Sequence, residues 1–142
     1  MTRFWDKTGE FAPLVLRLGM VAVFFYFGIS QLLSPDLFVF YLPKEAALIP
    51  LAQNTLIYIN GAFEVVFGTL LLLGIWRRIV ALLLGLHLMA ITVSIGWSDI
   101  GARDFGLSIA TLAVAMVQED KYTLPYFLNK RGSAADKPQE EH

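Results

Sequence analysis

The residues of this chain that could do chemistry are a carboxylate and an imidazole, each set within a long apolar stretch. Glu64 lies near the middle of the stretch from Thr55 to Gly74, and His87 lies near the middle of the next stretch. A carboxylate at that depth in a bilayer costs several kcal/mol unless it is paired, hydrated or protonated. Glu64 and His87 could form a hydrogen-bonded or charge pair, and we take them as the candidate catalytic residues. The alternative for His87 is a hydrogen-bonded packing role.

Further polar side chains recur along single faces of the apolar stretches. At about 100° per residue, positions seven apart, or alternately three and four apart, share one face of a helix. By this rule each of four predicted helices carries one stripe of polar and small residues, with bulky aliphatic residues on its other sides. Such residues occupy helix–helix contacts in membranes, so the stripes predict a shared polar interior. The candidate ligand-binding residues on the stripes are Arg17, Gln31, Asn60, Ser94, Asp104 and Ser108.

Some of these residues have purely structural alternatives. Arg17 either reaches the cytoplasmic interface along its aliphatic stem or forms a salt bridge with Glu64. The serine and threonine stripe of the last helix, which includes Ser108, can serve helix packing alone. Gly61 and Gly68 predict a close approach of neighbouring helices.

Four predicted membrane-spanning helices must position these side chains. Of the 142 residues, 56% are hydrophobic and 16% are charged, whereas a soluble domain is normally about one-quarter charged. We expect an all-α integral membrane protein, an antiparallel four-transmembrane-helix bundle with an interfacial loop between its first two helices. The spans are expected at about 13–33, 55–74, 79–97 and 102–118, in a membrane domain of residues 1–131 that precedes a disordered polar tail at 132–142.

The first and fourth spans each leave an alternative open. The first could be a cleaved signal segment, but no small-residue cleavage pattern follows it, so we expect a retained helix. The stretch Asp104–Val117 is shorter than the roughly 20 residues that a span needs. The fourth span must therefore include flanking residues, and we expect the side chain of Arg103 to snorkel outward to the membrane surface.

The loop at 37–54 has a distinctive composition. Pro43 and Pro50 prevent it from forming one long helix. Its aromatic residues suit the membrane–water interface, which favours an interfacial half-helix. A re-entrant gate over a binding site is the alternative.

Basic residues are distributed unevenly between the two sides of the predicted bundle. With four spans, Lys44 and Arg103 lie on one side, and both termini and the connection at 75–78 lie on the other. The excess of positive charge on that second side predicts that the termini are cytoplasmic. The basic residues on the cytoplasmic side are Arg3, Lys7, Arg77, Arg78, Lys121, Lys130, Arg131 and Lys137.

The composition also excludes several kinds of site. The chain has no cysteine, which excludes disulfides, thiol catalysis and iron–sulfur clusters within it. Its two histidines, His87 and His142, make a bis-histidine haem within one subunit unexpected, and no zinc motif is present. We therefore predict no metal site and no tightly bound cofactor. No basic stripe with interleaved aromatics indicates nucleic acid, so the lipid bilayer is the expected partner.

Several stretches of the chain together resemble a known family. The segments LRLGMVAVFFYFGISQLLSPDLF, GAFEVVFGTLLLLGIWRRIVALLL and DFGLSIATLAVAM, with a YLP loop after the first, are similar to the DoxX/DoxD family of small membrane proteins. The likeness covers about residues 13–118 and implies a four-helix bundle in a prokaryotic cell (inner or plasma) membrane. The family pattern often has Lys where this chain has Gln31. This chain therefore lacks a charge near the outer face that many relatives carry. The residues that match the pattern are Arg17, Gly28, Pro35, Glu64, Gly68 and Gly74.

The resemblance and the buried polar groups motivate a leading hypothesis. Some relatives are the quinone-reducing membrane subunit of a thiosulfate:quinone oxidoreductase, and many have no established activity. In such a role Glu64 would carry protons, His87 would donate a hydrogen bond to a quinone carbonyl, and Arg17 would be an electrostatic partner. Electrons would come from a soluble or membrane redox partner, because the chain lacks cysteines, a pair of histidines to bind haem and a set of metal ligands.

Two alternatives belong to other functional classes. The first is a non-enzymatic module, either an anchor for a soluble partner or a small-molecule or lipid-binding membrane protein. Its support is the basic, aromatic segment Lys121–Arg131, which suits anionic headgroups or a docking partner. The second is a proton-coupled transporter. It would require a homodimer, because the predicted bundle is small and lacks two matched broken helices.

Overall fold

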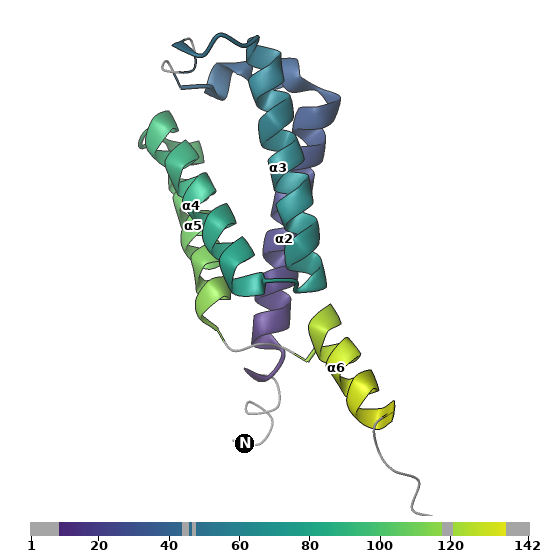
Figure 1. Cartoon of the computed structure of the whole chain (residues 1–142). Coiled ribbons are helices and arrows are strands. Elements are labelled where there is room, and N and C mark those ends of the chain that lie inside the picture. The colour runs from purple at the N-terminus through teal and green to yellow at the C-terminus, as the bar shows by residue number, and fades with distance from the viewer. Residues whose placement is uncertain (1–8, 44–45, 47, 118–120, 136–142) are drawn as a thin grey trace, which may run out of the picture.

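The computed structural model of the chain describes residues 9–43, 46, 48–117 and 121–135. Every regular element within these ranges is helical, which confirms the all-α prediction (Figure 1). Two short 3-10 helices follow the first long helix, and a separate helix ends the described chain. In order, the elements are α2 (Ala12–Leu33), η1 (Pro35–Leu37), η2 (Val39–Tyr41), α3 (Gln53–Leu73), α4 (Arg77–Ile95), α5 (Asp99–Met116) and α6 (Leu124–Ala135).

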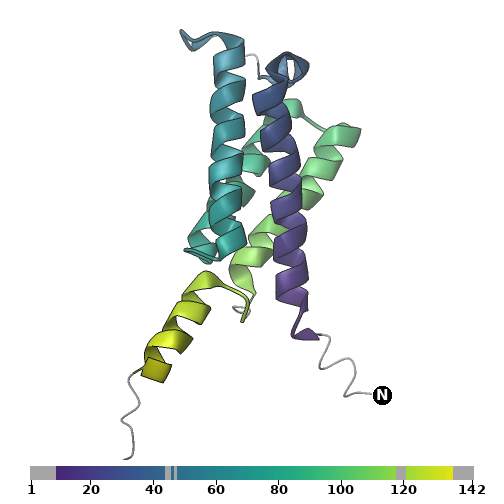
Figure 2. The same cartoon turned by 90° about the vertical axis from the view of Figure 1, so that its right-hand side faces the viewer.

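The four long helices form two antiparallel hairpins. α2 packs along α3 and α4 packs along α5, while the smaller contacts between the hairpins join α2 to α5 and α3 to α4. The hairpins converge at the end that carries the α3–α4 connection and diverge toward η1 and η2 (Figures 1 and 2). α6 projects away from the converging end. Side chains that line the space between the diverging ends therefore come from both hairpins.

The first hairpin closes on two facing glycines. A Cβ atom added at Gly61 would lie 2.8 Å from the carbonyl oxygen of Gly28, and one added at Gly28 would lie 3.0 Å from that of Gly61. Farther along the interface, a Cβ atom at Gly68 would lie 3.2 Å from the ring of Phe25. The close helix approach expected at Gly61 and Gly68 is therefore present. It brings Gln31 of α2 alongside the polar residues of α3.

Helix α3 ends in a Schellman motif that turns the chain sharply toward α4. Gly74 has a φ of 72°, in the left-handed region that glycine adopts without steric cost. Its N–H donates to the carbonyl of Leu71 at 3.1 Å, and the N–H of Ile75 donates to that of Leu70 at 3.0 Å. These bonds satisfy carbonyls that the helix end would otherwise leave unpaired.

The helices begin one to three residues earlier than the spans expected from the sequence. The expected spans 13–33, 55–74, 79–97 and 102–118 correspond to helices at 12–33, 53–73, 77–95 and 99–116. α4 includes Arg77, whose Nη2 donates to the carbonyl of Val117 at 2.7 Å, so the predicted polar connection is partly helical. α5 begins at Asp99, where a turn was expected, because the Ser98 hydroxyl accepts the N–H of Gly101 at 3.1 Å and caps the helix.

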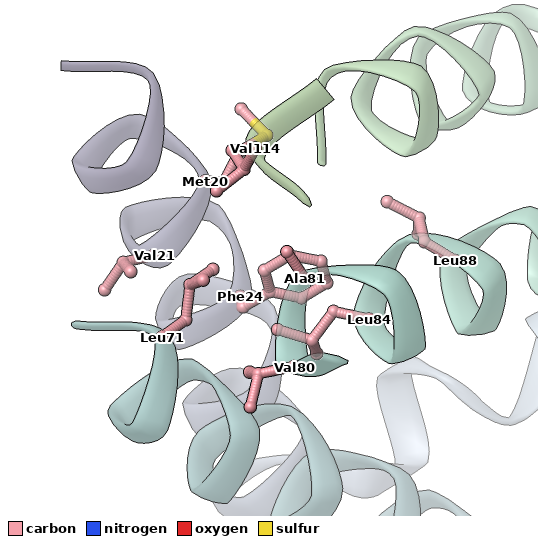
Figure 3. Close-up of a cluster of buried hydrophobic side chains, with 9 residues drawn as sticks. All are labelled: Met20, Val21, Phe24, Leu71, Val80, Ala81, Leu84, Leu88 and Val114. Carbon is pink, nitrogen blue, oxygen red and sulfur yellow. The ribbon is translucent and has the colours of Figure 1, made fainter. Parts of the chain in front are cut away.

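Apolar side chains from all four long helices pack together where the hairpins converge (Figure 3). Phe24, Leu71, Leu84 and Val114, one from each helix, are each at most 2% exposed. Lipid tails are as apolar as these side chains, so moving the side chains out of lipid gives little hydrophobic gain. In a membrane the helices associate instead through close van der Waals packing of this kind. The remaining buried members of this apolar cluster are Met20, Val21, Val80, Ala81 and Leu88.

Three helices, α2, α3 and α4, are long and apolar enough to cross a membrane by length and composition. Large apolar side chains on their outer faces, such as Val15, Val66 and Val93, are more than half exposed, as expected for lipid-facing positions. α5 has 18 residues, includes Arg103 and Asp104, and is not among the three. The prediction of membrane-spanning helices is thus confirmed for three of the four expected spans.

The loop between α2 and α3 lies at the diverging end. It begins with the two single-turn helices η1 and η2, and Asn54 Nδ2 at the start of α3 donates to Asp36 Oδ1 at 2.7 Å. Short 3-10 turns, rather than the expected half-helix, therefore occupy the first part of the segment 37–54. Residues 44, 45 and 47 of that segment lie outside the described ranges.

The C-terminal segment is more helical than expected. α6 continues to Ala135, so residues 132–135 of the tail expected to be disordered are helical, and residues 136–142 lie outside the described ranges. The N–H of Phe127 donates to the carbonyl of Thr123 at 3.2 Å at the start of α6. Pro125 lies in the first turn of α6, where a backbone N–H has no partner within the helix. The missing N–H of proline therefore costs no hydrogen bond there.

Candidate functional site

Three polar side chains of the first hairpin form a hydrogen-bonded cluster around a carboxylate, here called the Glu64 cluster. Asn60 Nδ2, one turn away on α3, donates to Glu64 Oε1 at 2.9 Å, and Gln31 Nε2 of α2 donates to Glu64 Oε2 at 3.3 Å. Asn60 Nδ2 also donates to Gln31 Oε1 at 2.7 Å. Glu64 is 3% exposed. Each of its carboxylate oxygens therefore has an amide donor, as a buried acid requires.

His87 of α4 approaches the same carboxylate from the second hairpin. Its Nε2 lies 4.0 Å from Glu64 Oε1, which is too far for a hydrogen bond. This nitrogen is buried, and it has no hydrogen-bond partner among the described residues. The imidazole packs against Phe63, with 4.6 Å between ring centroids. Buried polar atoms are nearly always hydrogen-bonded, so this nitrogen can bond to a water or to a ligand atom beside the ring.

These groups line a cavity of about 710 Å³ between the two hairpins. Small-molecule sites typically measure about 300–1,000 Å³ and are mostly apolar with a few polar groups. Aliphatic and aromatic side chains form most of the wall, including Phe27, Phe38 and Tyr41. The candidate residues that the structure brings together in the wall are Gln31, Asn60, Glu64, His87, Ser94 and Asp104.

The wall on α5 holds a charged pair. Arg103 Nε donates to Asp104 Oδ1 at 2.8 Å, and the guanidinium carbon of Arg103 lies 5.1 Å from the ring centroid of Phe27 on α2. Asp104 is 6% exposed. Arg103 therefore links the two hairpins at the cavity wall, whereas simple snorkelling was expected. The helical repeat missed this pair because neighbouring residues in sequence project from different faces of a helix.

Arg17 lies at the converging end, away from the Glu64 cluster. It is 1% exposed, and its guanidinium donates to the carbonyls of Leu71 (3.1 Å) and Leu72 on α3 and of Tyr122 (2.9 Å). Leu71 is seven residues beyond Glu64, roughly 10 Å along the helix. Arg17 therefore forms no salt bridge with Glu64, and its guanidinium binds carbonyls in the last turn of α3.

The two candidate serines have different surroundings. Ser108 is fully buried and donates to the carbonyl of Asp104 at 2.8 Å, one turn back along α5, and it is not among the cavity-lining residues. Ser94 donates to the carbonyl of Ala90 at 3.0 Å and lies on an exposed part of the cavity wall. The surroundings of Ser108 thus match the packing alternative, and Ser94 remains beside the site.

The aromatic side chains of the cavity wall are the main group that sequence reasoning did not assign to the site residue by residue. Phe38 and Tyr41 come from the aromatic loop after α2, and Phe24 and Phe27 come from α2 itself. The composition of the loop was a usable signal. In a membrane helix, however, an aromatic residue that faces a cavity cannot be distinguished by type from one that faces lipid.

Comparison with known proteins supports the family resemblance. No curated protein and no solved structure gives a significant match. A family model described as DoxX matches residues 12–97, which is more than half of the chain. This region includes α2, α3 and α4, and therefore the Glu64 cluster and His87. With its apolar helices, the match identifies a multi-pass membrane protein, and the chain belongs to the DoxX family.

Proposed function

We propose that this protein is the membrane subunit of a quinone-linked oxidoreductase and that the cavity between the hairpins binds the quinone ring. One observation carries the proposal: a largely apolar cavity brings the Glu64 cluster together with the Nε2 of His87, which has no hydrogen-bond partner in the described part of the chain. A quinone has an apolar ring and tail with two carbonyl acceptors, which suits such a wall. The resemblance to quinone-reducing DoxX/DoxD proteins supports the same reading.

Each polar residue has a distinct task in this proposal. His87 Nε2 donates a hydrogen bond to one quinone carbonyl. Glu64 relays a proton toward the ring, and the amides of Gln31 and Asn60 hold its carboxylate in place. Reduction of a quinone to a quinol consumes two electrons and two protons. The electrons come from thiosulfate through a soluble or membrane redox partner, because this chain has no cysteine to bind an electron carrier.

The proposal includes a topology in which α5 is the fourth span. α5 packs along α4, and its Asp104 faces the cavity, so its charged residues need not meet lipid. The positive-inside rule then places both termini in the cytoplasm of a prokaryotic cell, and η1 and η2 at the outer face of the membrane. α5 is short for a span, but it lies within the range of about 17–25 residues observed for such helices.

Quinone binding and turnover can be measured on the full chain purified in lipid nanodiscs. We expect extractable quinone in the wild-type protein and thiosulfate-dependent quinone reduction when the redox partner is supplied. Glu64→Gln should lower turnover by about 100-fold or more, which is the usual contribution of a positioned proton donor. His87→Phe keeps a ring but removes one hydrogen bond, worth about 0.5–1.5 kcal/mol, so quinone affinity should fall by about 2–10-fold.

A matched control separates the site from general charge effects. Glu10→Gln makes the same chemical change on a side chain that is 70% exposed, and it should leave both measurements unchanged. If the wild-type protein binds no quinone, or if Glu64→Gln turns over as fast as Glu10→Gln, the proposed function is wrong.

The non-enzymatic alternative, an anchor or lipid-binding module, is favoured by one specific feature. Tyr126, Phe127 and Leu128 of α6 are at least 40% exposed, and Lys121 and Lys130 beside them are exposed as well. Apolar and basic residues together suit a surface of anionic lipid. If α6 binds such a surface, nanodiscs with anionic lipid should protect it from protease more than neutral nanodiscs do, and Lys121→Gln with Lys130→Gln should remove the difference.

A further inference from the structure

The cavity occupies only the part of the molecule near η1 and η2. Along α2 and α4 its lining begins at Val23 and His87, and along α3 and α5 it ends at Glu64 and Leu107. These four limits lie close to one level across the hairpins, because neighbouring helices are antiparallel and each limit is 9 to 11 residues from the end of its helix at the converging side. Every lining residue therefore lies at that level or on its η1 side.

The two ends of the cavity differ in how exposed the side chains that form them are. At the inner limit, Phe24, Glu64 and Leu88 are 2%, 3% and 9% exposed. At the other end, Leu33 and Leu37 are 78% and 72% exposed. All five side chains line the same cavity, so its open end is the one next to η1.

Beyond the inner limit, the apolar cluster fills the space between the helices (Figure 3). Leu84 and Val114 are fully buried there, and the hydroxyl of Thr111, also fully buried, is held by the carbonyl of Leu107 at 2.7 Å and by the sulfur of Met20 at 3.3 Å. A proton or a polar solute crosses such a layer only with its hydration shell removed, which is unfavourable.

We infer that the site formed by Glu64 and His87 exchanges water, protons and small polar solutes through the end that carries η1 and η2, and that the apolar cluster seals it from the end that carries the α3–α4 connection. This access route concerns the cavity itself and holds whatever ligand the cavity binds. Under the proposed quinone function, on which this one consequence rests, the two protons consumed per quinone enter from the η1 side.

Cysteine labelling tests the route directly, because the chain has no cysteine of its own. Leu88→Cys places a thiol where the apolar cluster meets the cavity wall. Leu84→Cys places one a single turn nearer the α3–α4 connection, inside the cluster and outside the cavity lining. The full chain is reconstituted in sealed vesicles of known orientation, and a membrane-impermeant anionic methanethiosulfonate is added to one face at a time. Leu88→Cys should react from the η1 face. Leu84→Cys should react at least about tenfold more slowly from either face, because buried core positions open rarely.

Further variants calibrate the two faces. Ser94→Cys reports the η1 face, Arg78→Cys reports the opposite face, and Asn60→Cys provides a second inner position should Leu88→Cys fail to fold. Reaction of either inner cysteine from the Arg78 face would overturn the inference. So would protection of both inner cysteines from the η1 face while Ser94→Cys reacts. One-sided labelling without quinone binding would retain the access route and remove only the proposed function.

Discussion

Replacing Gly61 with alanine should force the first hairpin apart at the level of the Glu64 cluster. The new Cβ atom would lie 2.8 Å from the carbonyl oxygen of Gly28 and 3.0 Å from Cβ of Gln31. Ordinary van der Waals contact begins at 3.4 Å, so α2 must move away by about 0.6 Å, because the nearest atom belongs to its backbone. Overpacking of this kind costs about 1–3 kcal/mol.

The same displacement would act on the hydrogen bonds of Gln31. Its Nε2 already lies 3.3 Å from Glu64 Oε2, so an increase of about 0.6 Å would exceed hydrogen-bond distance. The bond between Asn60 and Gln31 starts at 2.7 Å and should survive in a weaker form. Loss of the Gln31–Glu64 bond adds about 1 kcal/mol to the destabilisation and leaves one carboxylate oxygen without its amide donor.

Thermal unfolding in detergent measures this cost, with Gly19→Ala as the matched control. Gly19 is on the same helix α2 as Gly28, but a Cβ atom added there meets nothing within 4 Å. Alanine is favoured over glycine within a helix by about 0.5–1 kcal/mol, so Gly19→Ala should have an unchanged or higher Tm. Gly61→Ala should melt several degrees below the wild-type protein. Equal Tm values for the two variants would refute the argument that close glycine packing positions Gln31.

Two further substitutions test the converging end. Arg17→Ala should destabilise the protein by about 1–3 kcal/mol, because it leaves part-buried carbonyls such as that of Leu72 without their guanidinium donor. It should also speed proteolysis next to Tyr122, and wild-type resistance to protease would contradict this role. Gly74→Ala should cost about 1–3 kcal/mol because its φ is 72°. The new Cβ atom would also clash with Thr123, so adding Thr123→Ala should restore part, but not all, of the lost Tm; no recovery would show that the clash is relieved in another way.

The sequence predicts the helices of this protein well because a long apolar block in a bilayer has few alternatives. Backbone groups in lipid must be satisfied within the segment, which favours helices. The helical repeat also identifies the polar faces that line the cavity, including Gln31, Asn60 and Glu64 on the first hairpin and His87 on the second. It does not predict the starts of α4 and α5 or the existence of α6, because these depend on local caps and turns such as the one at Ser98.

By itself the sequence determined the helical class, three membrane-spanning helices, the family and the polar face of each helix. Only the tertiary structure decided where Arg17 and Arg103 bind and that the cavity is open at one end. Arg17 contacts residues 54 and 105 positions away along the chain, and Arg103 contacts the other hairpin through Phe27. Periodicity is a property of one helix, whereas these contacts depend on how the hairpins are placed against each other. That placement is decided by the packing of glycines and of the apolar cluster, to which many residues contribute together.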